Sequence, residues 1–165
     1  MIDAVRRCMF RELDGFAAEL DGYPDDAAVW TDLPGFANST GTLTLHVCGG
    51  LRHFIGAGIG GSSYVRDRDL EFSKRGVSRA ELHLLLAVTR DEIARAFELF
   101  DPAKLSEQFP LEMGGHRIRT DLMLVHLTAH LGYHLGQADG HRRATTGERK
   151  SVGAMGATAI LETRD

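Results

Sequence analysis

Hydrophobic residues recur at steps of three and four along four separate stretches of this 165-residue chain. Spacing of this kind places the apolar side chains on one face of an α-helix. Strand-like alternation is weak throughout, so the pattern predicts an all-α fold, an antiparallel four-helix bundle with long connecting loops. The four predicted helices cover residues 2–20, 42–58, 79–100 and 120–143.

The predicted helices begin at residues that are suited to capping. Ser78 and Glu81 have the spacing of a capping box and would open the third helix. The segment 38–40 offers cap residues before the second helix, and Thr120 or Asp121 is expected to cap the fourth. The connections of roughly 16 to 20 residues are long for a plain bundle, and long ordered loops often build a site.

Glycines mark two further features of the chain. Gly49 and Gly50 lie in the middle of the second predicted helix, where each costs about 1 kcal/mol relative to alanine. Their presence suggests that another element or a ligand approaches the helix closely there. A short hairpin is expected around Gly114 and Gly115.

Length and composition indicate one domain over residues 1–165, in which the tail 147–165 is unassigned. The stretch 152–161 fits a short strand, a helix or a dimer contact equally well. A net charge of -4 gives no basic surface for nucleic acid. No apolar run reaches the roughly 18 residues of a membrane span, and the charged start lacks a signal-peptide core. Two cysteines make no disulfide framework, so we expect a cytoplasmic protein.

Histidine is the compositional outlier, with eight residues. Three of them, His126, His130 and His134, follow one another at four-residue steps on the fourth predicted helix. Residues four apart share a helix face, and leucines surround this stripe. Such a stripe predicts a divalent metal as its partner, because neutral imidazole binds zinc, nickel, iron or copper.

The rise of the helix limits which histidines can bind one ion. His126 and His134 lie about 12 Å apart along the axis, so the chelating pair is either His126 with His130 or His130 with His134. The spacing leaves both pairs open. The second predicted helix carries His46 and His53 on nearly the same line, and it can supply a third nitrogen. Three protein nitrogens and one open position are typical of catalytic zinc sites.

Two stretches of the sequence resemble a known family. The run His130-Leu-Gly-Tyr-His134-Leu-Gly-Gln137 is similar to the fourth-helix signature of the DinB superfamily, H-x-x-Y/H-H-x-G-Q. Residues 45–55 resemble the second helix of that superfamily, and residues 64–72 look like one uncharacterised branch of it. The resemblance covers roughly residues 5–143. Leu135 departs from the arginine that many members carry before Gly-Gln.

The resemblance implies a four-helix bundle, often dimeric, with a metal held by one histidine of the second helix and two of the fourth. Carried over by position, the ligands are His46, His130 and His134. Zinc or nickel is then the expected metal, with iron as an alternative. Some members are thiol-dependent S-transferases that use mycothiol, bacillithiol or glutathione, which implies a low-molecular-weight thiol as partner. The reaction itself stays open: a metal-dependent hydrolase and a non-catalytic, metal-stabilised dimer of stress-response type are the alternatives.

Several residues are expected around these ligands. Gln137, one turn after His134, is placed to hydrogen-bond a ligand. Tyr133 is expected to pack between helices. The charged run 66–69 is either a solvated loop or the mouth of the site, where Arg66 would meet an anionic substrate. His126 and His53 are expected near the site without binding the metal. The three other histidines are expected to be solvated, namely His83, His116 and His141.

Overall fold

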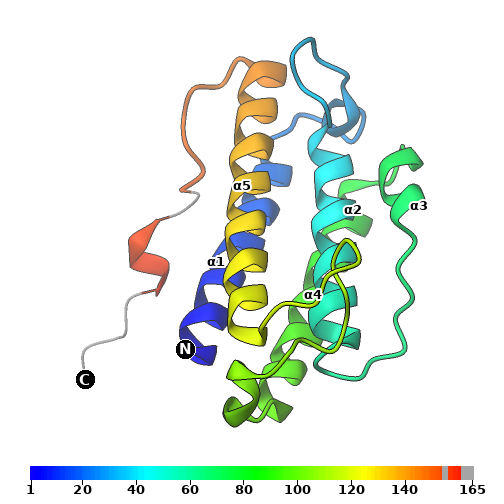
Figure 1. Ribbon diagram of the computed structural model, residues 1–165. Helices are drawn as coiled ribbons and strands as arrows, with labels where there is room; N and C mark the ends of the chain where they lie inside the picture. The colour runs from blue at the N-terminus through cyan, green and yellow to red at the C-terminus, as the bar shows by residue number, and fades with distance from the viewer. Residues whose placement is uncertain (154–155, 161–165) are drawn as a thin grey trace.

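The computed structural model describes residues 1–153 and 156–160, and the regular elements of this part of the chain are all helical. The all-α prediction is therefore confirmed. The four long helices lie side by side (Figure 1), and they are α1 (Ile2–Asp21), α2 (Thr40–Leu51), α4 (Arg79–Leu99) and α5 (Thr120–Thr146). None of the described helices has the length and apolar character that a membrane crossing requires.

Shorter helical segments join the long ones. A single π-helical turn, Arg52–Ala57, continues α2. The short helix α3 (Arg68–Ser73) lies within the connection from α2 to α4. Three 3₁₀ turns complete the described elements, at Ala28–Trp30, Pro102–Ser106 and Ala157–Ile160.

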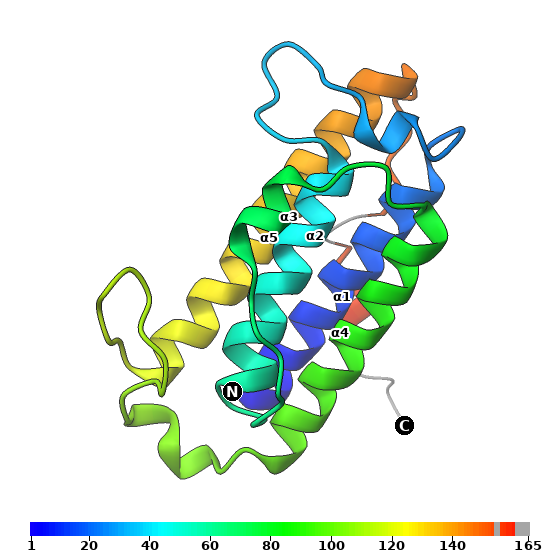
Figure 2. The ribbon, with the colours of Figure 1, turned by 90° about the vertical axis from the view of Figure 1, so that its right-hand side faces the viewer.

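Each long helix packs against two others, because α1 and α2 both contact α4 and α5. Figures 1 and 2 show that α1 and α5 run in one direction and that α2 and α4 run in the other. Adjacent helices are therefore antiparallel in the pairs α1/α4 and α2/α5 and parallel in the pairs α1/α5 and α2/α4. The parallel pairs arise because the connection 58–78 returns the chain to the end of the bundle at which α2 began.

The predicted apolar stripes form the core. All five positions predicted for the first helix are buried, with at most 8% of each residue exposed: Val5, Met9, Leu13, Phe16 and Leu20. Side chains from the other long helices close the same core. Burial of this apolar surface is the main driving force for the fold.

Capping follows the sequence at two of the three predicted helix starts. Ser78 and Glu81 form the predicted capping box of α4, and the Ser39 side chain accepts a hydrogen bond from the Thr42 N–H at the start of α2. The prediction for α5 is wrong. Thr120 is the first residue inside that helix, and both its N–H and its hydroxyl donate to the Glu107 carbonyl.

The connections differ from the prediction mainly at α3, which the sequence did not indicate. A helix of six residues has too few turns to show a period. Asp67 caps it by accepting a hydrogen bond from the Leu70 N–H. The hairpin at Gly114 and Gly115 is confirmed, since both have positive φ between the bridged residues 113 and 116. The predicted 152–161 segment lies partly outside the described residues.

Candidate metal centre

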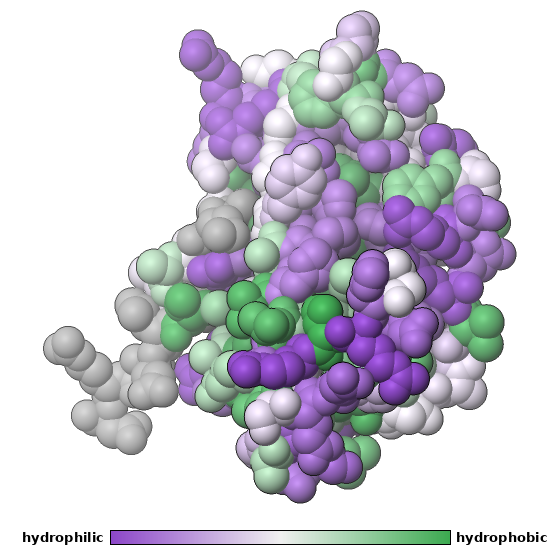
Figure 3. Space-filling model, viewed as in Figure 1, coloured by the Kyte–Doolittle hydropathy of each residue, from purple (hydrophilic) through white to green (hydrophobic). Residues whose placement is uncertain are grey.

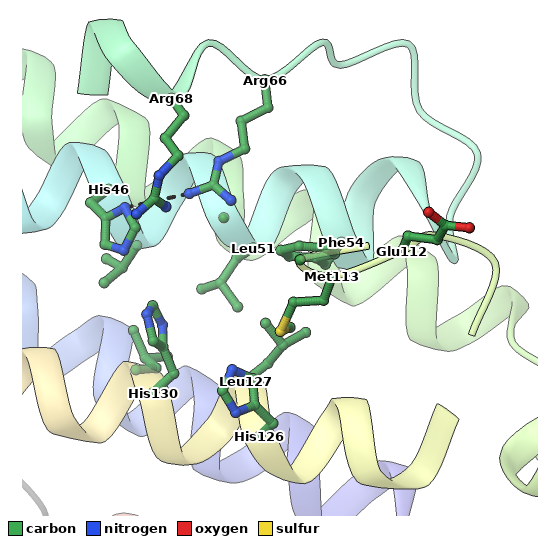
Figure 4. Close-up of a pocket in the computed structure, with 14 residues that line it drawn as sticks. His46, Leu51, Phe54, Arg66, Arg68, Glu112, Met113, His126, Leu127 and His130 are labelled. Atoms are coloured by element: carbon green, nitrogen blue, oxygen red, sulfur yellow. Dashed lines mark hydrogen bonds between the residues drawn. The ribbon is translucent and has the colours of Figure 1, made fainter. Parts of the chain in front are cut away.

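Three histidines from two helices converge at the middle of the bundle. One ring nitrogen each of His46, His130 and His134 lies within 4.8 Å of the other two. The Nε2 atoms of His130 and His134 are 3.0 Å apart. Figure 4 shows the rings of His46 on α2 and His130 on α5 facing each other across the gap between the helices. Of the two pairs that the spacing left open, the fold brings His130 and His134 to His46 and leaves His126 outside the cluster.

Hydrogen bonds to neighbouring oxygens set the tautomers of two of these rings. His46 Nδ1 lies 3.0 Å from Oε2 of Glu71, and His134 Nδ1 lies 2.7 Å from Oε1 of Gln137. The amide of Gln137 is oriented by a second bond, in which its Nε2 donates to the Tyr133 hydroxyl at 3.1 Å. The nearest partner of each Nδ1 atom is an acceptor oxygen, and the other contact of His46 Nδ1, to Nη2 of Arg66, is longer at 3.4 Å. Nδ1 therefore carries the proton, and the lone pair lies on Nε2. The lone pairs therefore belong to the nitrogens that can bind a metal.

Glu71 is the residue at this site that the sequence did not indicate. The Arg66 guanidinium donates to both of its carboxylate oxygens, at 2.7 and 2.8 Å. Burial alone would raise the pKa of Glu71, but the hydrogen bonds from Arg66 and His46 outweigh burial and lower it. Glu71 is therefore ionised and can hold the His46 ring in place, as carboxylates often do behind metal-binding histidines.

Gly49 explains how Glu71 comes so close to α2. A Cβ atom at this position would lie 2.0 Å from Oε1 of Glu71. The predicted close approach at Gly49 and Gly50 is thus confirmed, and the approaching group is the side chain pair of Glu71 and Arg66. This glycine was the only feature of the sequence that pointed toward the contact.

The two cluster histidines of α5, His130 and His134, are held neutral. Burial, with the neighbouring His134 and His46 rings, lowers the pKa of His130 to about 4. Burial likewise lowers the pKa of His134, although the bond to Gln137 opposes the shift. Neutral imidazole is the form that binds a transition metal.

This donor set fits a divalent transition metal. Zinc–nitrogen bonds of about 2.0–2.1 Å place tetrahedral ligand atoms about 3.3 Å apart, and the nitrogens here are separated by 3.0 to 4.8 Å. Within residues 1–153 and 156–160, no fourth histidine, cysteine or carboxylate joins the group. Three nitrogens with one position left for another ligand are typical of a catalytic rather than a structural zinc site.

A pocket of about 410 Å³ opens beside the cluster. His46 and His130 lie at one end of it, and the loop that carries Glu112 and Met113 lies at the other (Figure 4). Apolar side chains form much of the wall between these ends, namely Val47, Leu51, Phe54, Leu127 and Leu131. Such a pocket has the size and lining of a small-molecule site.

The other predicted site residues occupy different positions. His126 is exposed, lines the pocket and has its ring centroid 5.9 Å from that of His130. Arg66 lines the pocket too. His53 lies about 10 Å farther along the helix than His46, outside the pocket lining, with its ring against Phe54. Tyr133 does not pack between helices: it is 64% exposed, and it contacts the site through Gln137 and through its ring, whose centroid lies 5.3 Å from that of His134.

The expectation for His141 is wrong. This residue is fully buried near the end of α5. Its two ring nitrogens find partners inside the protein: the Tyr23 hydroxyl lies 2.6 Å from Nδ1, and the Thr31 carbonyl lies 2.8 Å from Nε2. His116 is exposed and His83 is partly exposed. Cys8 and Cys48 are free, and burial raises the pKa of the Cys48 thiol to about 12, so this thiol is unreactive at neutral pH.

The fold and the site define a helical bundle with a three-histidine cluster at the wall of a small-molecule pocket. Comparison with protein families identifies it further: the model of the mycothiol-S-transferase family matches residues 4–147. The chain belongs to this family, which agrees with the resemblance to the DinB superfamily. Comparison with curated proteins and with solved structures gave no match.

Proposed function

We propose that this protein is a metal-dependent thiol S-transferase that uses mycothiol as its small-molecule thiol. The observation that carries the proposal is the convergence of three imidazole nitrogens, joined by no fourth histidine, cysteine or carboxylate of the described residues, at the wall of a pocket. Membership of the mycothiol-S-transferase family supports the choice of thiol. Residues 1–165 are taken as one domain, and its four long helices as the bundle typical of the DinB superfamily.

His46, His130 and His134 would hold the metal, with zinc or nickel preferred. A divalent ion at this place would lower the pKa of a bound thiol and so supply a thiolate at neutral pH. Glu71 and Gln137 would hold two of the imidazoles in the binding orientation. The apolar wall would exclude water from the reacting atoms.

The transfer itself requires no change of oxidation state. The thiol sulfur attacks an electrophilic carbon in the pocket, and a carbon–sulfur bond forms. In a substitution, the leaving group departs with its bonding electron pair. In a conjugate addition, the carbon next to the new bond takes up a proton. The proton of the thiol passes to solvent.

The pocket favours this proposal over a non-catalytic, metal-stabilised bundle. A structural site would have a fourth protein ligand and no cavity beside it. The three-histidine group has no fourth histidine, cysteine or carboxylate from the described residues, and a cavity of about 410 Å³ adjoins it. A hydrolase would use the same three ligands with water in place of the thiol, so the thiol dependence of the reaction separates these two activities.

The test measures thioether formation from mycothiol and 1-chloro-2,4-dinitrobenzene, with protein reconstituted with zinc or with nickel. We expect a metal-dependent rate that His130→Ala abolishes. The exposed His116 lies outside the cluster, so His116→Ala should keep the wild-type rate. A chelator-treated protein that is as fast as the reconstituted one would refute metal dependence. A protein that binds metal and accelerates nothing would favour the non-catalytic bundle.

We also propose that the protein is a homodimer. Figure 3 shows hydrophobic side chains gathered over the part of the surface where α5 begins. Leu122 and Val125 on this part of α5 are 56% and 55% exposed. Beside them, Val5 and Cys8 of α1 help to form an apolar hollow. Sedimentation analysis should give a dimer for the wild type and a monomer for Val125→Glu, and a monomeric wild type would refute this.

A further inference from the structure

We infer that the electrophilic substrate of this pocket carries a carboxylate, which pairs with Arg68, and a hydrocarbon body, which lies along Leu51, Phe54 and Met113. This inference deepens the proposed function, because it assigns a class of electrophile to the same site. It rests on the charges and contacts around the pocket.

Two arginines lie at the end of the pocket that holds His46, and they differ in how they are paired. The guanidinium of Arg66 donates to both carboxylate oxygens of Glu71, so its charge is compensated. The side chain of Arg68 also lines the pocket, and Figure 4 shows it at the same end of the pocket as His46. Both side chains lie near the Phe72 ring. Arg68 forms no ion pair with any carboxylate of the described residues.

The acidic neighbours of Arg68 do not neutralise it. Asp67 accepts a hydrogen bond from the Leu70 N–H at the start of α3. Asp69 forms no ion pair within the described part of the chain. The Cζ atom of Arg68 lies 5.1 Å from the centroid of the Phe72 ring, so an aromatic face supports the guanidinium from one side. Its N–H groups stay available, and their planar fork matches a carboxylate.

The charge of the site itself adds to this preference. Three neutral imidazoles leave a divalent ion with both of its positive charges, and a thiolate would compensate only one of them. Arg68 brings a further positive charge to the same end of the pocket. An electrophile with an anionic group would therefore be favoured there over a neutral one.

The rest of the pocket favours a hydrocarbon body in the substrate and determines which way the substrate is oriented. Leu51, Phe54 and Leu127 present apolar surface, and Met113 adds a thioether that adapts to ligands of different shape. Glu112 lies at the far end, where Arg117 pairs with it at 3.4 Å, so that end offers a carboxylate no unpaired cation among the lining residues. The substrate carboxylate should therefore point to Arg68, with the electrophilic carbon a few bonds away and close to the three histidines.

The experiment compares two probes of nearly the same shape, 4-phenylbutyrate and 4-phenylbutanamide, by isothermal titration calorimetry on the zinc-reconstituted full-length protein and on the chelator-treated protein. The acid should bind about ten-fold more tightly than the amide, because its carboxylate adds a negative charge to the group that accepts the hydrogen bonds of Arg68. Arg68→Gln should make the two affinities equal. Arg75→Gln is the matched control, since Arg75 is exposed and donates to the backbone carbonyls of Phe72 and Lys74.

Three results would overturn the inference. They are equal binding of acid and amide by the wild type, an acid preference that survives Arg68→Gln, and the absence of saturable binding in both forms of the protein. The chelator-treated protein contains no zinc, so an acid preference measured with it cannot come from a bond between the carboxylate and zinc. Because the readout is binding, an Arg68-dependent acid preference without thioether formation would refute the proposed function and leave the carboxylate-binding role of Arg68 standing. Thioether formation without the preference would do the reverse.

Discussion

Helix α5 carries histidines in two contrasting environments. At its middle, His130 and His134 direct their Nε2 atoms toward each other at 3.0 Å, beside a pocket. At its end, His141 is fully buried, and both of its nitrogens meet protein oxygens, on Tyr23 and Thr31. Burial lowers the pKa in both environments, so burial does not distinguish them.

The difference lies in what the lone pairs face. The Nε2–H of His141 donates to the Thr31 carbonyl, so its Nδ1 accepts from the Tyr23 hydroxyl, and no lone pair is left for a metal. In the cluster, Glu71 and Gln137 take up only the Nδ1 protons of their partners, and the lone pairs on the other side remain. The same residue type on the same helix is therefore structural in one place and suited to bind metal in the other.

The largest expected effect is a contrast between two variants: loss of His130 should abolish zinc binding, and loss of His141 should lower stability. His130→Ala should reduce bound zinc from one equivalent to less than roughly a tenth of an equivalent and leave the metal-free protein folded. His141→Ala should keep one equivalent and lose about 2–4 kcal/mol of unfolding free energy, because a buried hydrogen-bonded ring is replaced by a cavity. Zinc analysis and urea unfolding measure the two effects. Loss of zinc from both variants would contradict the assignment of His141 to a purely structural role.

A smaller effect on zinc binding is expected when a residue that hydrogen-bonds one of the three histidines is changed. Glu71→Gln removes the charge that holds His46, and it should weaken zinc binding by about 10- to 100-fold. The exposed Glu81 lies at the start of α4, away from the cluster, and Glu81→Gln is the matched control. Competition with a chelator of known affinity gives both constants. Unchanged zinc affinity in Glu71→Gln would mean that the carboxylate serves only the ion pair with Arg66.

Alanine substitutions at two glycines test the contact between Glu71 and α2 without changing Glu71 itself. The Cβ atom of Gly49→Ala would collide with Glu71, so we expect weaker zinc binding and lower stability. At Gly136, no heavy atom would lie within 4 Å of an added Cβ atom. Gly136→Ala should therefore raise stability by up to about 1 kcal/mol and leave zinc binding unchanged. Thermal unfolding with and without zinc measures both variants, and similar behaviour of the two would contradict the role of Gly49.

The smallest expected effect is the pH dependence of the metal-free protein. The folded pKa of His130 is lowered to about 4, whereas an unfolded histidine titrates near about 6.5. Below that pH the unfolded chain binds the proton that the folded state rejects, so stability should fall as pH decreases from about 6.5 toward 4. Urea unfolding of the wild type and of His130→Ala over this range isolates the contribution. A wild type that loses no more stability than the variant would contradict it.

The sequence predicted much of this arrangement because its evidence was local. The period of three and four located the long helices, and the four-residue spacing of His130 and His134 placed both imidazoles on one face. The choice between His126 and His134 required the position of α2, which no single helix encodes. The resemblance to the DinB superfamily supplied that choice before the structure did.

The features that the sequence did not reveal depend on contacts between distant segments. Glu71 reaches His46 from a connection of the chain with no clear pattern, and only Gly49 hinted at the approach. His141 is bonded to Tyr23, which lies 118 residues earlier in the chain, so its burial has no local signature. Tyr133 was predicted to pack between helices, but its position on α5 turns it outward.

The central claim is that His46, His130 and His134 bind one metal ion and leave one position for a thiol. Zinc K-edge X-ray absorption of the reconstituted protein, without and with mycothiol, tests it most directly. We expect three imidazole nitrogens at about 2.0–2.1 Å in both samples and, with mycothiol, one added sulfur at about 2.3 Å. Fewer than three imidazoles around the zinc, or a coordination sphere that gains no sulfur when mycothiol is added, would contradict the account.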